Sequence, residues 1–189
     1  MVEGRRLLMV SDRELMARAL AGDGTAFDGI VLRYQDALFR HLLGLAGSRE
    51  QAEDLCQEAF VRLYRALPRF DQGRPVAPLL FRIATNLWRD SRKRPSAIPA
   101  TGEVEAPDCR TEVADRALQR LEREAIAEAV ARLRWEYRAV ISLRYDQGLS
   151  YREIAEAMRV APGTVATWLH RALDALRAAL RESGQEVGQ

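Results

Sequence analysis

The sequence contains few of the residues on which disulfide-bonded and metal-binding proteins depend. It has two cysteines and two histidines among 189 residues, and aromatic side chains make up only 7%. Two cysteines, Cys56 and Cys109, are too few for a disulfide framework, and they lack the spacing of a metal site. We therefore expect two reduced thiols, with Cys56 in a helical core, and no metal.

Long apolar runs and a strong net charge are also absent. No stretch approaches the roughly eighteen apolar residues of a membrane span, and the N-terminus lacks the apolar segment of a secretory signal. We therefore expect a cytoplasmic protein with no direct membrane insertion. The net charge is only +2, which excludes a uniformly basic nucleic-acid coat, so any basic surface is local.

The sequence has no recognisable catalytic constellation. His41 lies on the flank of an apolar helix pattern, and His170 lies within a second helix pattern. No phosphate-binding loop, pair of acidic residues in a cleft or metal cluster accompanies either histidine. We predict that the protein is not an enzyme and has no catalytic residue, no cofactor and no small-molecule substrate.

Helical periodicity, in contrast, runs through almost the whole chain. Apolar residues recur at spacings of three and four, and glycines and prolines cluster between the periodic segments. We predict an all-α protein of two small helical domains, residues 11–94 and 111–182, joined by a flexible linker at residues 95–110. Fully extended, this linker can span roughly 50 Å, so the domains are free to lie apart.

The segment from Leu149 to Leu173 has the pattern of a helix-turn-helix. Ser150 and Glu153 have the spacing of a capping box, which predicts a short helix from Ser150. A turn follows, and Pro162 suits the first position of the next helix. The second helix has an apolar face and an outward stripe, which we call the recognition face. Its members are Thr164, Thr167, Trp168 and Arg171.

Only one helix fits into a DNA major groove, so the recognition face would supply the contacts with bases and phosphates. Arg171 can bond to a guanine or a phosphate, and the threonines can bond to a phosphate or touch a thymine methyl group. The alternative is an ordinary helical hairpin with a solvated polar side. The capping box, the turn and the proline coincide, which favours DNA binding.

The first predicted domain carries an acidic helix after the break at Gly47 and Ser48. Leu55, Ala59 and Leu63 mark its inner side, whereas the outer side carries Asp54, Gln57 and Glu58, which we call the acidic face. Negative charge near a helix start is favourable in itself. The pattern alone leaves open whether the acidic face is merely solvated or binds a partner.

A loop is predicted from Pro68 to Pro78, and a helix follows and ends before Pro95. This helix carries a polar stripe of Arg82, Asn86, Arg89 and Lys93, which we call the basic stripe. Basic residues at a helix end also complement its dipole. Phe81 and Trp88 are nearby, and we expect them to stack on an unpaired base, which favours nucleic-acid binding.

Three segments, in order and at matching spacing, carry a family resemblance. They are AEDLCQEAFVRLYRAL, FRIATNLWRDSRKR and LSYREIAEAMRVAPGTVATWLHRAL. With them the chain resembles the bacterial RNA polymerase sigma factors of the extracytoplasmic-function (ECF) group, over nearly all of residues 15–180 apart from the linker. The resemblance implies a subunit that directs polymerase core to specific promoters, assists promoter melting and is regulated by an anti-sigma factor.

The resemblance also implies a partner for each surface. The acidic face would bind the beta-prime clamp of RNA polymerase core, and the basic stripe would contact the minus-ten element of promoter DNA. The loop from Phe70 to Pro78 would capture a flipped base, and the recognition face would contact the minus-thirty-five element. Ala166, Thr167 and Trp168 differ from the family's usual residues, so we expect an unusual minus-thirty-five preference or a modest affinity.

A second hypothesis is a dimeric helix-turn-helix regulator that binds an operator. It accounts for the C-terminal half, but it leaves the acidic face and the basic stripe without a role.

Overall fold

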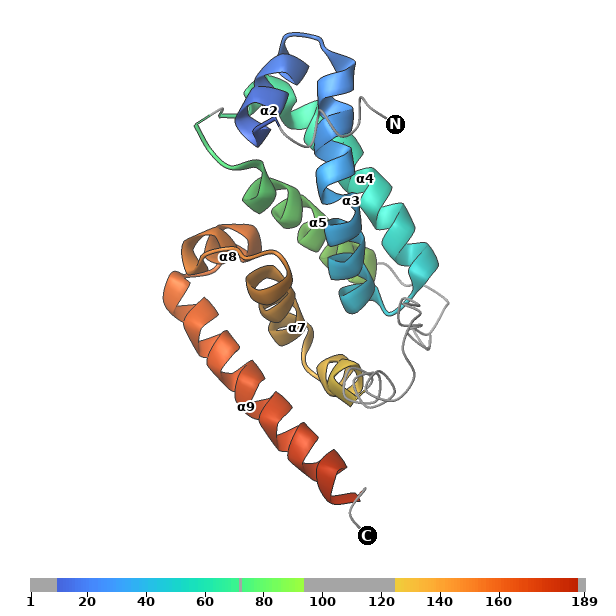
Figure 1. Ribbon diagram of the computed structural model, residues 1–189, viewed down its shortest axis with the longest axis vertical. Helices are drawn as coiled ribbons and strands as arrows, with labels where there is room; N and C mark the ends of the chain where they lie inside the picture. The colour runs from blue at the N-terminus through green and yellow to red at the C-terminus, as the bar shows by residue number, and fades with distance from the viewer. Residues whose placement is uncertain (1–9, 72, 94–124, 187–189) are drawn as a thin grey trace.

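The computed structural model describes residues 10–71, 73–93 and 125–186. Within these ranges the regular elements are helices and no strand is present (Figure 1). The predicted all-α fold class is therefore confirmed. The predicted linker, together with Cys109, lies outside the described residues.

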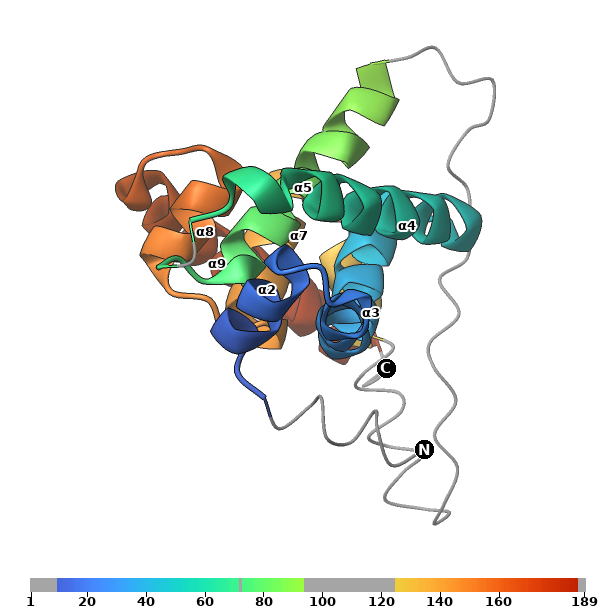
Figure 2. The ribbon, with the colours of Figure 1, turned by 90° about the horizontal axis from the view of Figure 1, so that it is seen from above.

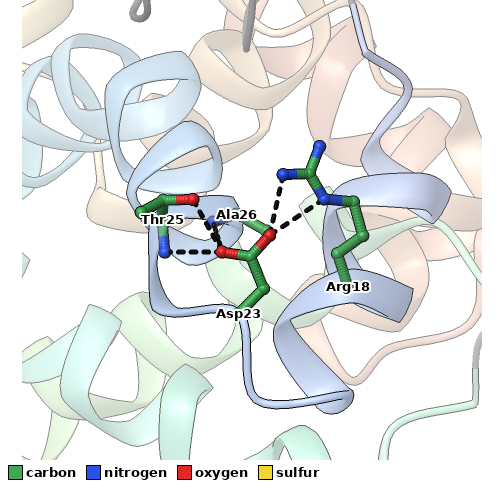
Figure 3. Close-up of polar contacts among 4 residues, drawn as sticks. All are labelled: Arg18, Asp23, Thr25 and Ala26. Atoms are coloured by element: carbon green, nitrogen blue, oxygen red, sulfur yellow. Dashed lines mark hydrogen bonds and ion pairs between the residues drawn. The ribbon is translucent and has the colours of Figure 1, made fainter.

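In the described part of the chain, the first two helices are separated by a short turn that a single carboxylate organises. Helix α2 (Asp12–Leu20) begins after Ser11, whose Oγ accepts the Glu14 N–H, and α3 (Gly24–Ala46) begins after Asp23. Asp23 accepts hydrogen bonds from the Thr25 hydroxyl and backbone N–H and also pairs with Arg18 (Figure 3). These contacts lower the pKa of Asp23 to about 2. One side chain thus caps α3 and anchors the end of α2.

Helix α4 (Arg49–Ala66) follows a sharp turn at Gly47, which adopts a φ of +70°. Ser48 caps α4 by accepting the Gln51 N–H. A short 3₁₀ helix, η1 (Leu67–Arg69), ends the segment. Cys56 of α4 is half-buried, and burial raises the pKa of its thiol to about 11, which makes it a poor nucleophile.

Helix α5 (Val76–Lys93) begins earlier than the sequence predicted. The expected loop extended to Pro78, but Pro78 is buried within the first turn of α5. A proline fits there because the first backbone N–H groups of a helix have no intrahelical acceptor. Helix α3 packs against α2, α4 and α5, and the core they enclose includes Leu15, Ile30, Leu38 and Leu63.

The C-terminal half contains a helical segment at residues 125–131, then α7 (Trp135–Ile141), a single π-helical turn η2 (Ser142–Asp146), α8 (Tyr151–Met158) and α9 (Pro162–Glu186). The predicted capping box at Ser150 and Glu153 is present. Arg159 ends α8 in a left-handed conformation, and Pro162 is the first residue of α9. The predicted helix-turn-helix is therefore formed.

The two halves lie against each other, which the linker length alone left undetermined. Helix α8 lies beside α5, and α7 with η2 lies beside α3 (Figures 1 and 2). The Trp88 and Trp135 rings are 5.1 Å apart between centroids, and the Arg138 guanidinium donates to the Leu45 carbonyl at 3.2 Å. Most of the buried apolar residues of both halves belong to one cluster.

Candidate nucleic-acid interface

The acidic face lies on the outer side of α4. Asp54 and Gln57 are exposed, and Glu58 is half-buried and pairs with Arg62 one turn later, with 2.7 Å between Glu58 Oε1 and Arg62 Nε. Val61 on the same helix is also exposed. The acidic face is therefore a solvent-accessible surface that combines negative charge with an apolar neighbour.

The basic stripe runs along α5, where part of it faces the C-terminal half. Asn86 is half-buried, and the Arg89 guanidinium lies 5.7 Å from the centre of the Trp135 ring. Lys93 is exposed and pairs with Asp90 at 3.2 Å. Arg82 Nη1 lies 3.8 Å from a Glu156 carboxylate oxygen of α8. One end of the basic stripe thus faces another helix, and the other end faces solvent.

The predicted stacking residues of α5 are not available to a base. Phe81 is 0% exposed and Trp88 is 2% exposed. Phe81 packs edge-on against His41, and Trp88 packs against Trp135. The stacking prediction is therefore wrong, because these rings contribute to the apolar core that joins the halves. In the sequence both rings adjoin basic-stripe residues, and adjacency does not distinguish the two sides of a helix.

The segment before α5 borders a hollow of about 210 Å³. Its lining comes from α2 and from the predicted loop, and includes Asp12, Arg13, Met16, Phe70, Arg74 and Pro75. The hollow thus lies beside the start of α5, and two arginines, Arg13 and Arg74, are among its lining residues.

The recognition face lies on α9 and begins within its first turn. Thr167 and Arg171 are exposed, whereas Thr164 and Trp168 are half-buried. Trp168 packs partly against the apolar cluster, and the Thr167 hydroxyl donates to the Gly163 carbonyl at 2.9 Å. Opposite them, Val165, Leu169 and Ala172 are buried. The face is therefore accessible, with Arg171 as its exposed cation.

The structure adds Arg74 and Glu156, which the sequence did not single out. Arg74 Nη1 lies 3.1 Å from the same Glu156 oxygen that faces Arg82. The two paired residues are 82 positions apart, and no spacing in the sequence predicts a contact over this distance.

Within the described residues, no group of three or more histidine, cysteine or acidic side chains is arranged to hold a metal ion. Among the described helices, none combines the length and apolar character needed to cross a bilayer.

Comparison with known proteins finds two regions of this chain that match known families. The family described as "Sigma-70 region 2" matches residues 30–97, and "Sigma-70, region 4" matches residues 123–176. The first region includes α4 and α5, and the second includes the helix-turn-helix. The two matches therefore include all three of the surfaces described above.

Similar proteins span nearly the whole chain. The RNA polymerase sigma-H factor of Pseudomonas aeruginosa is 32% identical over 93% of this chain and 96% of its own length. The ECF sigma factor SigW of Bacillus subtilis is 37% identical over 85% of this chain and 92% of its own length. The structure of CnrH in complex with the cytosolic domain of CnrY superposes with a TM-score of 0.69, at 28% identity, over 90% of this chain and 97% of CnrH. With both sigma-70 regions in order and these relatives matched over most of their length, the chain belongs to the ECF group of bacterial RNA polymerase sigma factors.

Proposed function

We propose that this sigma factor uses the acidic face of α4 to bind the beta-prime clamp of RNA polymerase core. Asp54, Gln57 and Glu58 would make the contacts. A negative, solvent-accessible surface suits a basic partner, and opposite charge speeds association and favours the correct orientation. The exposed Val61 beside them adds apolar area that binding would cover. The accessibility of the acidic face is the single observation that carries this assignment.

The basic stripe of α5 would contact the minus-ten element and hold the separated strand. Arg82, Arg89 and Lys93 would neutralise phosphates, and Asn86 would bond to a base edge. The hollow beside Phe70 and Pro75 would receive the flipped base. Because Phe81 is buried against His41 of the same domain, the energy that offsets base extrusion would come from phosphate contacts and from this hollow.

The recognition face of α9 would contact the minus-thirty-five element as duplex DNA. Thr164, Thr167, Trp168 and Arg171 would enter the major groove, in the arrangement usual for a helix-turn-helix. The exposure of Thr167 and Arg171 supports this assignment. We accordingly assign core binding, minus-ten recognition and promoter melting to residues 11–94 and minus-thirty-five recognition to residues 111–182. Residues 95–110 would be the flexible linker between them.

An anti-sigma factor would regulate the protein by covering these surfaces. CnrH, which this chain resembles at 28% identity, was solved in complex with the cytosolic domain of another protein, CnrY. The sigma factor itself would perform no catalysis, since phosphodiester chemistry belongs to the polymerase core. It would act in the cytoplasm, where the polymerase is found.

One experiment tests the central claim. The purified chain is mixed with sigma-free polymerase core and followed by co-elution in size-exclusion chromatography and by run-off transcription from genomic DNA fragments. We expect a stable complex and discrete transcripts. If the chain binds DNA but does not bind polymerase core, as a stand-alone regulator would, the proposal is wrong.

A further inference from the structure

The carboxylate of Glu156 lies between two arginines of the other domain. Its Oε1 is 3.1 Å from Nη1 of Arg74 and 3.8 Å from Nη1 of Arg82. Arg74 precedes α5, Arg82 lies on its second turn, and Glu156 lies on α8, the first helix of the helix-turn-helix. One anionic oxygen of the C-terminal domain therefore engages two cations of the N-terminal domain.

The two arginines differ in how far the domain contact covers them. The Arg74 side chain is 62% exposed, whereas Arg82 is 29% exposed and Glu156 is 36% exposed. Guanidinium groups bind carboxylates and phosphates with the same geometry. The position of the Glu156 oxygen is thus one that a phosphate oxygen of a DNA strand can occupy.

Arg74 also lines the hollow at the start of α5. A strand that placed a base in this hollow would bring its sugar-phosphate backbone to the rim, where Arg74 lies. Arg82 is one of the basic-stripe residues on the neighbouring turn. The same two cations would therefore be needed by DNA and by Glu156.

We propose that Arg74 and Arg82 form a phosphate-binding pair for the separated promoter strand, and that Glu156 occupies this pair while the two domains are packed together. Helix α8 then competes directly with DNA, so the free sigma factor binds the minus-ten strand only after α8 leaves α5. The inference rests on the proposed function, since it assumes that the basic stripe binds this strand.

The competition between Glu156 and DNA determines how much a Glu156 variant changes the affinity for single-stranded DNA. When only a fraction of the molecules is open, the apparent affinity for DNA is the affinity of the open form multiplied by that fraction. A partly exposed ion pair contributes little by itself, and apolar contacts such as Trp88 with Trp135 hold the domains together as well. Neutralising Glu156 therefore opens the chain partially, and we expect Glu156→Gln to raise the affinity for single-stranded DNA by about two- to five-fold.

The test measures binding of the full chain to a fluorescent, mixed-sequence, single-stranded DNA 15-mer by anisotropy. A mixed sequence suffices because arginine contacts with phosphates are independent of the bases. Glu128→Gln is the matched control, because it removes the same charge from an exposed pair with Arg132 in the same domain. We expect Glu156→Gln to bind more tightly and Glu128→Gln to bind as the wild type does.

A second pair of variants separates competition from a general charge effect. In a chain that carries Arg74→Ala and Arg82→Ala, Glu156 has no phosphate-binding pair to block, so adding Glu156→Gln should leave the affinity unchanged. Adding Arg74→Ala alone to the Glu156→Gln chain should weaken binding and flatten the slope of log affinity against log salt by about 0.7, the value for one phosphate contact on a single strand.

Two results would overturn the inference. One is a Glu156→Gln affinity equal to that of Glu128→Gln. The other is a gain from Glu156→Gln that persists in the chain without the two arginines. If the wild type supports run-off transcription while either result is obtained, the competition is wrong and the sigma function stands. If the chain neither binds core nor supports transcription but the variants behave as expected, the proposed function falls and the competition between Glu156 and phosphate stands.

Discussion

His41 and Ser142 are separated by 101 positions in the chain, yet His41 Nδ1 lies 3.2 Å from Ser142 Oγ across the boundary between the two domains. The other ring nitrogen, Nε2, lies 3.2 Å from Oγ1 of Thr85 in α5. The imidazole is buried and links α3 to η2 and to α5. A neutral ring offers one donor and one acceptor, which two hydroxyl groups can satisfy.

This arrangement predicts a stability that depends on pH. Burial lowers the pKa of His41 to about 4 from an unfolded value of 6.5. Above pH 6.5 both states carry a neutral ring, whereas between pH 6.5 and 4 only the unfolded state takes up the proton. The free energy of unfolding should therefore fall by about 3 kcal/mol as the pH drops through this window, and flatten below it. Urea unfolding at several pH values measures it.

The control for this prediction is His41→Gln, which keeps hydrogen-bonding groups but does not titrate. Its stability should change less than that of the wild type over the same window, because only the carboxylates common to both proteins remain to titrate. Parallel curves for the two proteins would show that His41 is not the responsible group.

Trp88→Ala should destabilise the fold. The ring is 2% exposed and packs against Trp135, so its removal leaves a cavity that costs about 3–5 kcal/mol. Urea unfolding of the full chain measures this loss. If the unfolding free energy is unchanged while binding to single-stranded DNA is lost, Trp88 stacks on a base after all.

Arg171→Ala should weaken binding to the minus-thirty-five element by about 1–3 kcal/mol, the usual cost of removing one good arginine contact with DNA. The measurement is a binding isotherm on duplex promoter DNA at fixed salt. Arg177→Ala is the control, because Arg177 is exposed on the same helix and pairs with Asp174. Equal affinities for both variants would mean that another side of α9 faces the groove.

Glu58→Lys should weaken binding to polymerase core by at least about ten-fold, because a reversed charge replaces attraction by repulsion at a basic surface. Surface plasmon resonance on immobilised core measures the change. Glu128→Lys makes the same charge change on an exposed residue of the other domain and should bind core normally. Binding of Glu58→Lys to duplex promoter DNA should also be normal, which separates the acidic face from the recognition face.

The local features of this fold were predictable because they depend on neighbouring residues. Ser150 with Glu153 predicts the start of α8, and Pro162 predicts the start of α9. A capping box gives hydrogen-bond partners to free backbone N–H groups of the first turn, and a first-turn proline has no N–H group that needs a partner. A few consecutive residues are therefore enough to predict where a helix begins. The predicted start of α5 is wrong because a proline is compatible both with a loop and with a first helical turn, and Pro78 lies in the first turn.

The candidate surfaces were predictable in position but not in environment. Periodicity placed Asp54 and Gln57 on the outer side of α4 and Arg171 on the outer side of α9, where they are exposed. It also left Phe81 and Trp88 next to the basic stripe, and both rings proved to be buried. A helical period identifies which residues share a side, but it does not say how many sides another element covers.

The sequence by itself determined the helices, their caps, the helix-turn-helix and the order of the acidic, basic and recognition surfaces, because each depends on contacts within a few turns of chain. Only the tertiary structure decided that α8 lies on α5, that His41 joins the two domains and that Glu156 meets Arg74 and Arg82. These contacts join residues tens of positions apart. Their formation depends on how complementary apolar faces and charges meet in space, which no local spacing encodes.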